Sequence, residues 1–289
     1  MNKIIRIGGV PEHFNLPWQL AMEMGLFEKE GIDLQWEFYP AGTGAMVKAL
    51  KEGNLDMAVL LTEGAISAII NGLEAKLVQQ YVSSPLIWGI HSGPDSGINN
   101  IGGCENRKYA ISRFGSGSHL MAMIDAEVRG KKINQEDFVL IENMAGALKS
   151  LTENASQAFF WEKYTTKPLV DSGQLRRIGD FVTPWSCFQI AASNKALAEQ
   201  NNAVIKICEI IGFTASQFMK APNAIDILIE KFGMNEEDAH NWFYSTEWQT
   251  DNQISSKMIE NVMFSLKKIG AIGEPIAPNF LVAKQVLLT

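Results

Sequence analysis

The first 82 residues alternate between runs of strand length and amphipathic segments of helix length. This strict alternation predicts a parallel sheet with helices on both of its faces. Asn15 is expected to cap the first helix, with Pro17 in its first turn and Gly31 as its stop signal. The predicted strands are residues 3–10, 32–39, 56–61 and 76–82, and the predicted helices are residues 15–31, 41–53 and 62–72.

A second, smaller array of the same kind begins near residue 91, after the last strand of the first region. A connection rich in Gly, Asn and Ser opens it, and an irregular stretch leads from residue 162 to residues 184–193. From Lys195 onward the chain reads as mostly helical, with no sheet of its own, so we expect this tail to pack on the first region. The array has predicted strands at 107–112, 138–143 and 157–162, and predicted helices at 118–130, with Leu120, Ile124 and Val128 on one face, and at 145–154.

This order predicts two lobes joined by two chain crossings. Lobe 1 is expected to contain residues 1–90 and 190–289, and lobe 2 residues 91–189. The hinge is expected near residues 88–92 and 186–191, with a ligand cleft between the lobes.

The net charge argues against nucleic acid as the main partner. With 46% hydrophobic residues the chain can bury a large core, but its formal charge of −7 provides no basic face for phosphates. A small anionic ligand stays possible, because the field in a pocket is local. The longest uncharged stretch, Leu77 to Pro94, is broken by polar residues, so we expect no membrane insertion.

The N-terminal apolar run is too short for a signal peptide, because Pro11 interrupts it. We therefore expect a cytoplasmic protein, or a periplasmic one if a leader has been removed. The three cysteines lack CxxC spacing and the four histidines lack HExxH spacing, so we expect reduced, buried thiols, no metal site and no cofactor.

A resemblance to a known family is carried by residues 25–64, GLFEKEGIDLQWEFYPAGTGAMVKALKEGNLDMAVLLTEG. This stretch resembles the opening of type II periplasmic-binding-protein folds, in the branch of the nitrate-, taurine- and alkanesulfonate-binding proteins and the thiamine-pyrimidine synthases. The order of elements fits over nearly the whole chain. The resemblance implies a two-lobed α/β fold, each lobe a mixed, mainly parallel sheet flanked by helices. It also resembles the intracellular members of this group, which have no signal peptide. The cysteine-rich iron motif of the pyrimidine synthases is missing here.

Ligands of open α/β sheets gather at the carboxyl ends of the strands. The loop VPEHF at residues 10–14 either faces a cleft or uses its imidazole and phenyl groups internally, and the turn AGTGAM at 41–46 is either a tight turn or an anion contact. The ligand-binding residues predicted in lobe 1 are His13, Phe14, Asn15, Thr43, Gly44, Thr62, Glu63 and Ser83.

The stretch SRFGSGSHL, residues 112–120, is the strongest candidate in lobe 2. Its backbone N–H groups and serine hydroxyls at a helix start could hold an anion, with an arginine to form a forked contact, or the serines could serve only as a cap. It lacks the lysine of a nucleotide-binding loop. An aromatic residue further along could cover the ligand or belong to the core. The residues predicted in lobe 2 are Arg113, Ser116, Gly117, Ser118, His119, Trp161 and Glu162.

Three functions are compatible with this pattern. The first is a small-molecule binding protein that closes over an anionic or polar heterocyclic solute. The second is a cytoplasmic enzyme on the same fold, in biosynthesis of a thiamine- or menaquinone-like cofactor, with His13 and Glu12 as acid and base. The third is the sensing part of an assembly with a partner protein. No set of catalytic residues is apparent, so the catalytic residues stay unknown.

Overall fold

The computed structural model describes residues 3–104 and 107–289, and the chain falls into two compact units. Unit 1 runs to Pro85 and also contains Trp185–Phe264 and Ile272–Thr289, while unit 2 contains Leu86–Pro184 and Ser265–Ala271. The breaks at residues 85 and 184 lie slightly before the predicted hinge segments. Ser265–Ala271, which the sequence places in lobe 1, groups with unit 2.

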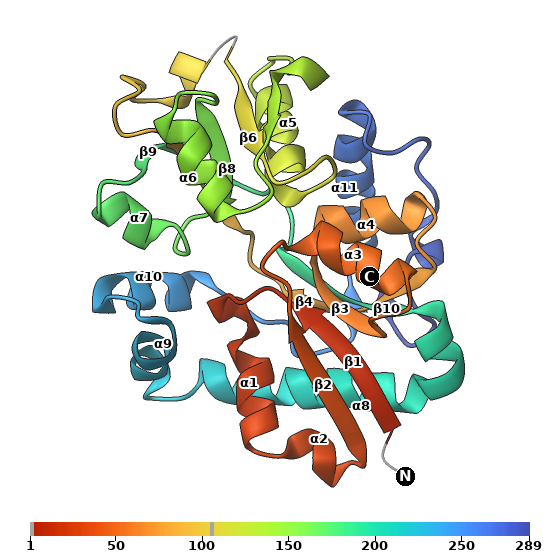
Figure 1. Cartoon of the computed structure of the whole chain (residues 1–289). Coiled ribbons are helices and arrows are strands. Elements are labelled where there is room, and N and C mark those ends of the chain that lie inside the picture. Colours follow the sequence, from red (N-terminus) through yellow and green to blue (C-terminus); the bar gives the residue numbers. More distant parts are fainter. Residues whose placement is uncertain (1–2, 105–106) are drawn as a thin grey trace. The chain divides into compact units, whose positions relative to one another are not determined.

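Unit 1 is built on a five-stranded sheet in the order β2-β1-β3-β10-β4 (Figure 1). β10 runs antiparallel to both of its neighbours, while the other strands share one direction, so the sheet is mixed but mainly parallel. The four predicted strands of the first region are confirmed. The strands are β1 (Lys3–Gly9), β2 (Ile32–Phe38), β3 (Met57–Leu61), β4 (Ala75–Val82) and β10 (Phe188–Ser193).

Helices cover both faces of this sheet. α3 connects β2 to β3 and α4 connects β3 to β4, both on one face, and α1 packs on the other face beside α8. The C-terminal region also contains a two-stranded parallel sheet, formed by β11 and β12, although no sheet is predicted there. The elements are α1 (Leu16–Glu23), α2 (Leu26–Lys29), α3 (Thr43–Lys51), α4 (Thr62–Ile70), α8 (Asn194–Met219), α9 (Ala224–Phe232), α10 (Glu236–Ser245), β11 (Gln253–Ile254), α11 (Ser256–Lys268) and β12 (Leu287–Leu288).

The first helix differs from its prediction at both ends. Asn15 holds the cap position of α1, but its side chain turns back and Nδ2 donates a 2.8 Å hydrogen bond to the Val10 carbonyl oxygen instead. At the other end, Gly25 adopts the left-handed conformation with φ of 62° and separates α1 from α2. The single helix predicted from residue 15 to Gly31 is therefore two helices, and Met24 is exposed at the break.

Unit 2 repeats the mixed arrangement with a sheet in the order β7-β6-β8-β5-β9, in which only β5 runs against the others. Two of its strands contradict the sequence analysis. β5 begins before the predicted connection at residue 91, and β9 occupies chain predicted to be irregular. The elements are β5 (Ile87–Ser92), β6 (Tyr109–Ile111), α5 (Gly117–Val128), β7 (Phe138–Leu140), α6 (Met144–Thr152), β8 (Ala158–Glu162), α7 (Lys167–Asp171) and β9 (Arg176–Val182).

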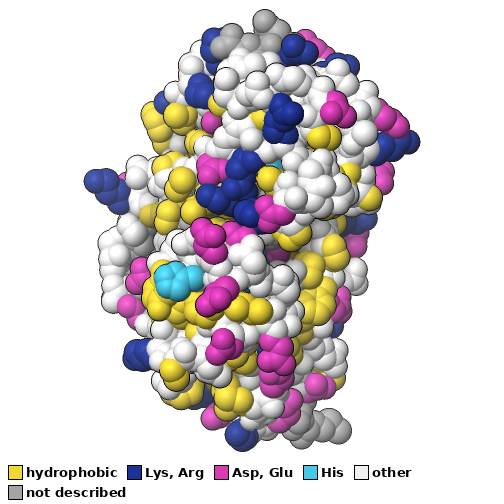
Figure 2. Space-filling view, turned by 90° about the vertical axis from the view of Figure 1, so that its left-hand side faces the viewer, with side chains coloured by type: hydrophobic (Ala, Val, Ile, Leu, Met, Phe, Trp, Pro, Cys, Tyr) yellow, Lys and Arg dark blue, Asp and Glu magenta, His cyan; other side chains and the backbone are white. Residues whose placement is uncertain are grey.

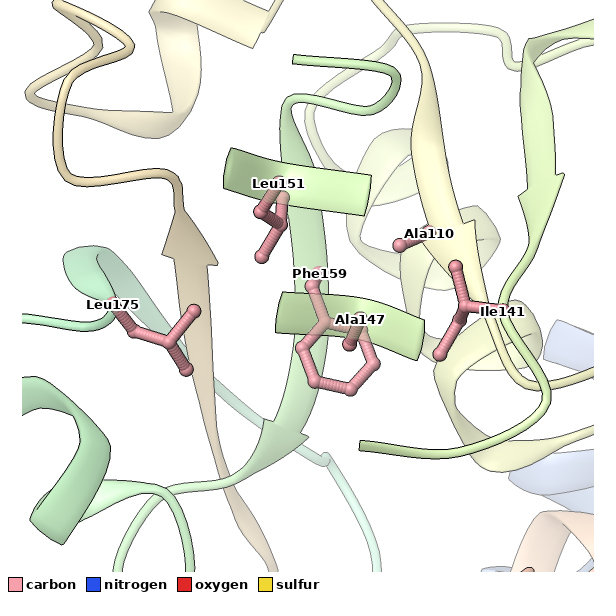
Figure 3. Packing of buried hydrophobic residues seen from close by; sticks show 6 residues of the cluster. All are labelled: Ala110, Ile141, Ala147, Leu151, Phe159 and Leu175. Carbon is pink, nitrogen blue, oxygen red and sulfur yellow. The ribbon is translucent and has the colours of Figure 1, made fainter. Parts of the chain in front are cut away.

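The core of unit 2 forms between its sheet and α6 (Figure 3). The ring of Phe159 from β8 lies against Ala147 of α6, and Leu151 follows one turn further along the same helix. On α5, Leu120 and Ile124 are buried as expected. Val128 is exposed, because it is the last residue of the helix.

Charges of both signs are interspersed over the face displayed in Figure 2, with apolar atoms between them. Within residues 3–104 and 107–289, none of the helices combines the length and the apolar composition that crossing a membrane requires.

Candidate functional site

The carboxyl edge of the unit 1 sheet gathers the predicted residues of lobe 1. β1 leads into a short 3-10 helix, His13–Asn15, and β3 leads directly into α4 with Thr62 and Glu63 in its first turn. α3 begins beside them, because the Thr43 hydroxyl oxygen accepts a 3.0 Å hydrogen bond from the Leu61 backbone N–H. The ends of two strands and the starts of two helices therefore meet at this edge.

The N-termini of α3 and α4 have no side-chain caps, although the first N–H of α4, that of Thr62, donates to the Cys187 carbonyl oxygen at 3.0 Å. Their cap positions are occupied by Gly42 and Leu61, neither of which has a polar side-chain group to bind the first-turn N–H donors. Gly44 adds no side chain in the first turn of α3. The helices pack closely, since a Cβ on Gly64 would stand 2.6 Å from the Thr43 methyl carbon. Helix starts of this kind attract anions and polar oxygen atoms.

Glu63 is a buried carboxylic acid at this edge. It is 1% exposed, and its Oε2 accepts a 3.0 Å hydrogen bond from Trp185 Nε1. Burial raises the pKa of Glu63 to about 7, and hydrogen bonds from the Trp185 indole and from the backbone of Glu63 itself oppose this shift without cancelling it. Near neutral pH the Glu63 carboxyl group therefore exists in comparable protonated and ionised populations.

Two other predicted residues of this unit use their polar groups internally. The Thr62 hydroxyl donates to the Ser186 carbonyl oxygen at 2.6 Å and accepts a 3.2 Å bond from Gln189 Nε2. The Ser83 hydroxyl donates to the Glu247 carbonyl oxygen at 3.1 Å. These bonds fix the chain around the strand ends, and direct contact of either hydroxyl with a ligand stays a prediction.

His13 and Phe14 belong to an aromatic cluster. The His13 imidazole meets the Trp242 ring edge-on at 4.3 Å between centroids and stacks on Phe14 at 5.0 Å. Burial lowers the pKa of His13 to about 3, so the ring is neutral at physiological pH. The Phe14 carbonyl oxygen accepts hydrogen bonds from Tyr81 and Trp248. Both rings thus have partners within the protein, and ligand contact by His13, Phe14 or Asn15 stays a prediction.

In unit 2 the serines of the Gly/Ser loop are bound within the protein. The Ser116 hydroxyl accepts from the His119 backbone N–H, donates to the Arg113 carbonyl oxygen at 2.7 Å and lies 3.0 Å from the Ser118 hydroxyl. Ser118 in turn accepts a 3.1 Å bond from the Ser112 N–H. The loop therefore caps α5, which begins at Gly117. Ligand contact by Ser116, Gly117 or Ser118 stays a prediction.

The flanking residues of this loop have different surroundings. His119 Nδ1 accepts a hydrogen bond from the Gly115 N–H, and burial lowers the pKa of His119 to about 4. Arg113 is half-buried, and desolvation lowers the pKa of its guanidinium group from its usual high value. A partly desolvated guanidinium binds an anion more strongly than one in open water does.

The last two predicted residues lie on β8. Trp161 stacks on Phe159 with ring centroids 5.4 Å apart and packs at the margin of the unit 2 core. Glu162 is buried and its Oε2 accepts a 2.6 Å bond from the Thr165 N–H. Burial raises the pKa of Glu162, while N–H donors from the following turn lower it. Both residues therefore have a structural role in this unit.

Trp185 is the site residue that sequence reasoning misses, because a tryptophan beside a chain crossing suggests packing. Its partner Glu63 is 122 positions away, so no local pattern reveals the pair. For metals, the described residues contain no cluster of three or more His, Cys, Asp or Glu side chains placed to bind an ion. Cys104 and Cys187 are buried, Cys208 is partly exposed, and none of the three forms a disulfide.

The two mixed sheets with their flanking helices define the class: the chain has the two-lobed α/β fold of the periplasmic-binding proteins. Residues 88–181 match the model of a family described as Ca3427-like PBP. Comparison with curated protein sequences gives no significant match.

Two of three solved structures agree over nearly the whole length. A Candida albicans protein, the CA3427 gene product, superposes with a TM-score of 0.89 at 24% identity, covering 98% of this chain and 97% of its own. The alkanesulfonate-binding protein SsuA from Xanthomonas axonopodis pv. citri, bound to MOPS, gives 0.78 at 15% identity, covering 99% and 98%. The periplasmic nitrate-binding protein NrtA from Synechocystis PCC 6803 gives 0.62 at 16% identity, covering 82% and 69%.

Proposed function

We propose that this protein binds a small anionic or polar heterocyclic solute at the carboxyl edge of the unit 1 sheet. The observation that carries the proposal is the meeting of the α3 and α4 N-termini with buried Glu63 at that edge. Solute binding is also the role named for structural neighbours, one of which binds alkanesulfonate and another nitrate. As in the sequence analysis, we propose that the two units close over the solute by a hinge motion.

The enzymatic alternative receives little support from the groups that motivated it. His13 would have to exchange protons near neutral pH, but its pKa is lowered to about 3 and its ring is packed among aromatic side chains. Solute binding without catalysis does not require His13 or Glu12 to gain or lose a proton. A cytoplasmic location and a partner protein stay predictions, which fractionation of the native source and a pull-down would test.

A charge placed at the start of α3 tests the binding site directly. Gly44→Asp adds a carboxylate in the first turn, where a helix tolerates negative charge well. We expect the variant to fold and to lose at least about tenfold in affinity for anionic solutes found by a thermal-shift screen of wild-type protein. Asn194→Asp at the start of α8, which follows the opposite end of the sheet, changes the charge by the same one unit; it is the matched control and should bind normally.

Two results would contradict the proposal. One is a broad screen of anions and heterocycles in which no compound stabilises the wild-type protein. The other is equal loss of binding in both variants, which would indicate a general effect of charge. Closure is a separate question, answered by whether the radius of gyration in small-angle X-ray scattering decreases when a confirmed solute is added.

A further inference from the structure

A cavity of about 240 Å³ lies in unit 1 and shares no lining residue with the candidate site at the carboxyl edge. Its walls come from β4, the middle of α8, the chain just before β11 and the chain just before β12, and we call it the α8 cavity. Val78, Ile205 and Cys208 form its apolar part. Since a cavity of roughly 150 Å³ can hold benzene, the α8 cavity has room for a ring with one polar substituent.

The amide group of Gln79, in the wall of this cavity, is only partly satisfied. Gln79 is 2% exposed, and its Nε2 donates a 3.5 Å hydrogen bond to the Gln249 carbonyl oxygen. This bond assigns the two ends of the amide, because the opposite orientation would place its oxygen against another oxygen. Oε1 is therefore a buried acceptor, and it has no donor among residues 3–104 and 107–289. A buried acceptor without a donor costs free energy, which a ligand can recover.

Gln285 carries the complementary group. Its Nε2 is a buried donor without an acceptor in the described part of the chain, so it does not pair with Gln79 Oε1 although both residues line the α8 cavity. The backbone at this position is held in place, since the Gln285 carbonyl oxygen accepts a 2.8 Å bond from Asn252 Nδ2. The side chain is half-buried and can turn toward a bound molecule. The cavity therefore lacks one donor and one acceptor.

The charged groups that line the α8 cavity are negative. They are Glu209 and Asp251, and the described lining includes no basic side chain. Glu209 is paired with Lys206 at 2.7 Å, whereas Asp251 Oδ1 accepts hydrogen bonds from Gln249 Nε2 and the Gln253 N–H, which are uncharged. A negative ligand would be repelled by the Asp251 carboxylate. The cavity thus favours an uncharged molecule.

We propose that the α8 cavity is a second binding site, which takes a small uncharged molecule with a primary carboxamide group. The amide N–H of the ligand donates to Gln79 Oε1 and its carbonyl oxygen accepts from Gln285 Nε2, while the rest of the molecule packs on Val78 and Ile205. A carboxamide carries donor and acceptor on one carbon, so a single group completes both side chains. A water molecule can offer the same bonds, but it occupies only about 30 Å³. This site is independent of the solute site proposed above.

Three matched probes test the proposal. Benzamide carries the donor and the acceptor, acetophenone has a methyl group in place of the amino group, and benzoate has a charged oxygen there. Titration of isotope-labelled protein, followed by NMR, gives the affinity for each probe. We expect benzamide to bind about tenfold or more tightly than either of the others, because it alone satisfies both glutamines without adding a negative charge.

Cys208 reports where the probe binds. It lines the α8 cavity and is partly exposed, whereas Cys104 and Cys187 are buried. We expect saturating benzamide to slow the modification of Cys208 by methyl methanethiosulfonate about threefold or more, because an occupied cavity excludes the reagent. Mass spectrometry of the peptides measures this rate. The side-chain amide signals of Gln79 and Gln285 should shift in the same NMR titration.

The variant Gln79→Leu assigns the preference to the buried amide. Leucine has a similar volume, and replacing an incompletely bonded amide by an apolar group should leave the fold intact. We expect the variant to bind benzamide and acetophenone within about threefold of each other. Gln285→Leu, at a half-buried position, should have the same effect. Gln80→Leu is the control and should keep the wild-type preference, because the Gln80 side chain accepts a bond from the Ser186 hydroxyl and does not line the cavity.

Each other result overturns the proposal. If benzamide does not bind, the α8 cavity holds only water. If acetophenone binds as tightly as benzamide, the cavity selects for shape and not for the amide. If benzamide binds without protecting Cys208, it binds elsewhere on the protein. If both leucine variants keep the preference, the two glutamines do not recognise the amide. None of these results affects the solute site at the carboxyl edge, which the screen of anions and heterocycles tests separately.

Discussion

The indole Nε1 of Trp185 lies 3.0 Å from Glu63 Oε2 and donates a hydrogen bond to it. This bond ties the first turn of α4 to the point where the chain re-enters unit 1. Because the donor favours the ionised carboxylate, it restrains the rise in pKa that burial imposes on Glu63. Trp185 therefore holds the acid in position and moderates the effect of burial on its protonation.

Replacing Trp185 with phenylalanine removes this donor. We expect the pKa of Glu63 in Trp185→Phe to move further above its value of about 7 in the wild-type protein. NMR titration of the Glu63 carboxyl carbon would measure the change. A wild-type titration curve in the variant would show that the hydrogen bond has no electrostatic effect.

Glu63→Gln should alter how stability depends on pH. The pKa of Glu63 is raised from 4.5 to about 7 in the folded state, so its proton is held more tightly than in the unfolded chain. The stability associated with the proton is complete below pH 4.5 and is lost as pH rises through 7. The variant lacks this loss, and its stability relative to wild type should increase by on the order of 3 kcal/mol between these pH values. Urea unfolding of wild type and Glu63→Gln at several pH values checks this.

His13 should produce the opposite dependence. Its pKa is lowered from 6.5 to about 3, so the unfolded chain takes up the proton first as pH falls. Stability is complete above pH 6.5 and is lost progressively toward pH 3, by on the order of 5 kcal/mol. His13→Phe keeps an aromatic ring in the cluster and should flatten this part of the acid-unfolding profile. An unchanged profile would mean that other groups, such as His91 and His119, dominate it.

Ser116→Ala tests the cap of α5. The substitution removes the acceptor for the His119 N–H and the donor to the Arg113 carbonyl oxygen. We expect a loss of about 1–2 kcal/mol in the free energy of unfolding, measured by chemical denaturation. Ser116→Asp keeps a capping acceptor and should recover part of the loss. If it does not, the hydroxyl matters for the Ser118 network rather than for the helix end.

Arg113→Ala separates anion binding from folding in unit 2. The half-buried guanidinium is the cation next to the α5 cap, and we expect its removal to weaken binding of an anionic ligand by about tenfold. The unfolding midpoint should change little by comparison. Arg113→Lys keeps the positive charge but not the forked guanidinium group. Its affinity for the anionic ligand should lie between those of the wild-type protein and Arg113→Ala. Unchanged affinity in Arg113→Ala would remove Arg113 from the site.

The α/β alternation of the first region was predictable because each helix and strand there is indicated by its own short stretch of sequence. The position of β10 was not, since it enters the sheet between β3 and β4 from more than a hundred residues away. β9 escaped prediction because it is an edge strand with charged residues such as Arg176 and Asp180, which break the apolar pattern. β9 and β10 become strands only because they pair with strands that are distant in the sequence.

In the candidate site, too, local features were predictable from the sequence and contacts between distant residues were not. The rule that ligands gather at strand ends includes Glu63 among the candidates from sequence alone, because it follows directly after β3. Whether its oxygens are satisfied depends on Trp185, which only the folded chain brings near. Likewise, the hydroxyl of Ser116 could be placed at the start of a helix, but its use within the protein could not be decided without its neighbours.

The entry of β10 also orders events on the ribosome. All five strands of the unit 2 sheet lie between Ile87 and Val182, whereas in unit 1 β4 has β10 as its sheet neighbour and must wait for Phe188–Ser193 to emerge. The sheet that starts first in the nascent chain is thus completed second. Until then the facing edges of β3 and β4 stay unpaired, and unpaired strand edges favour aggregation.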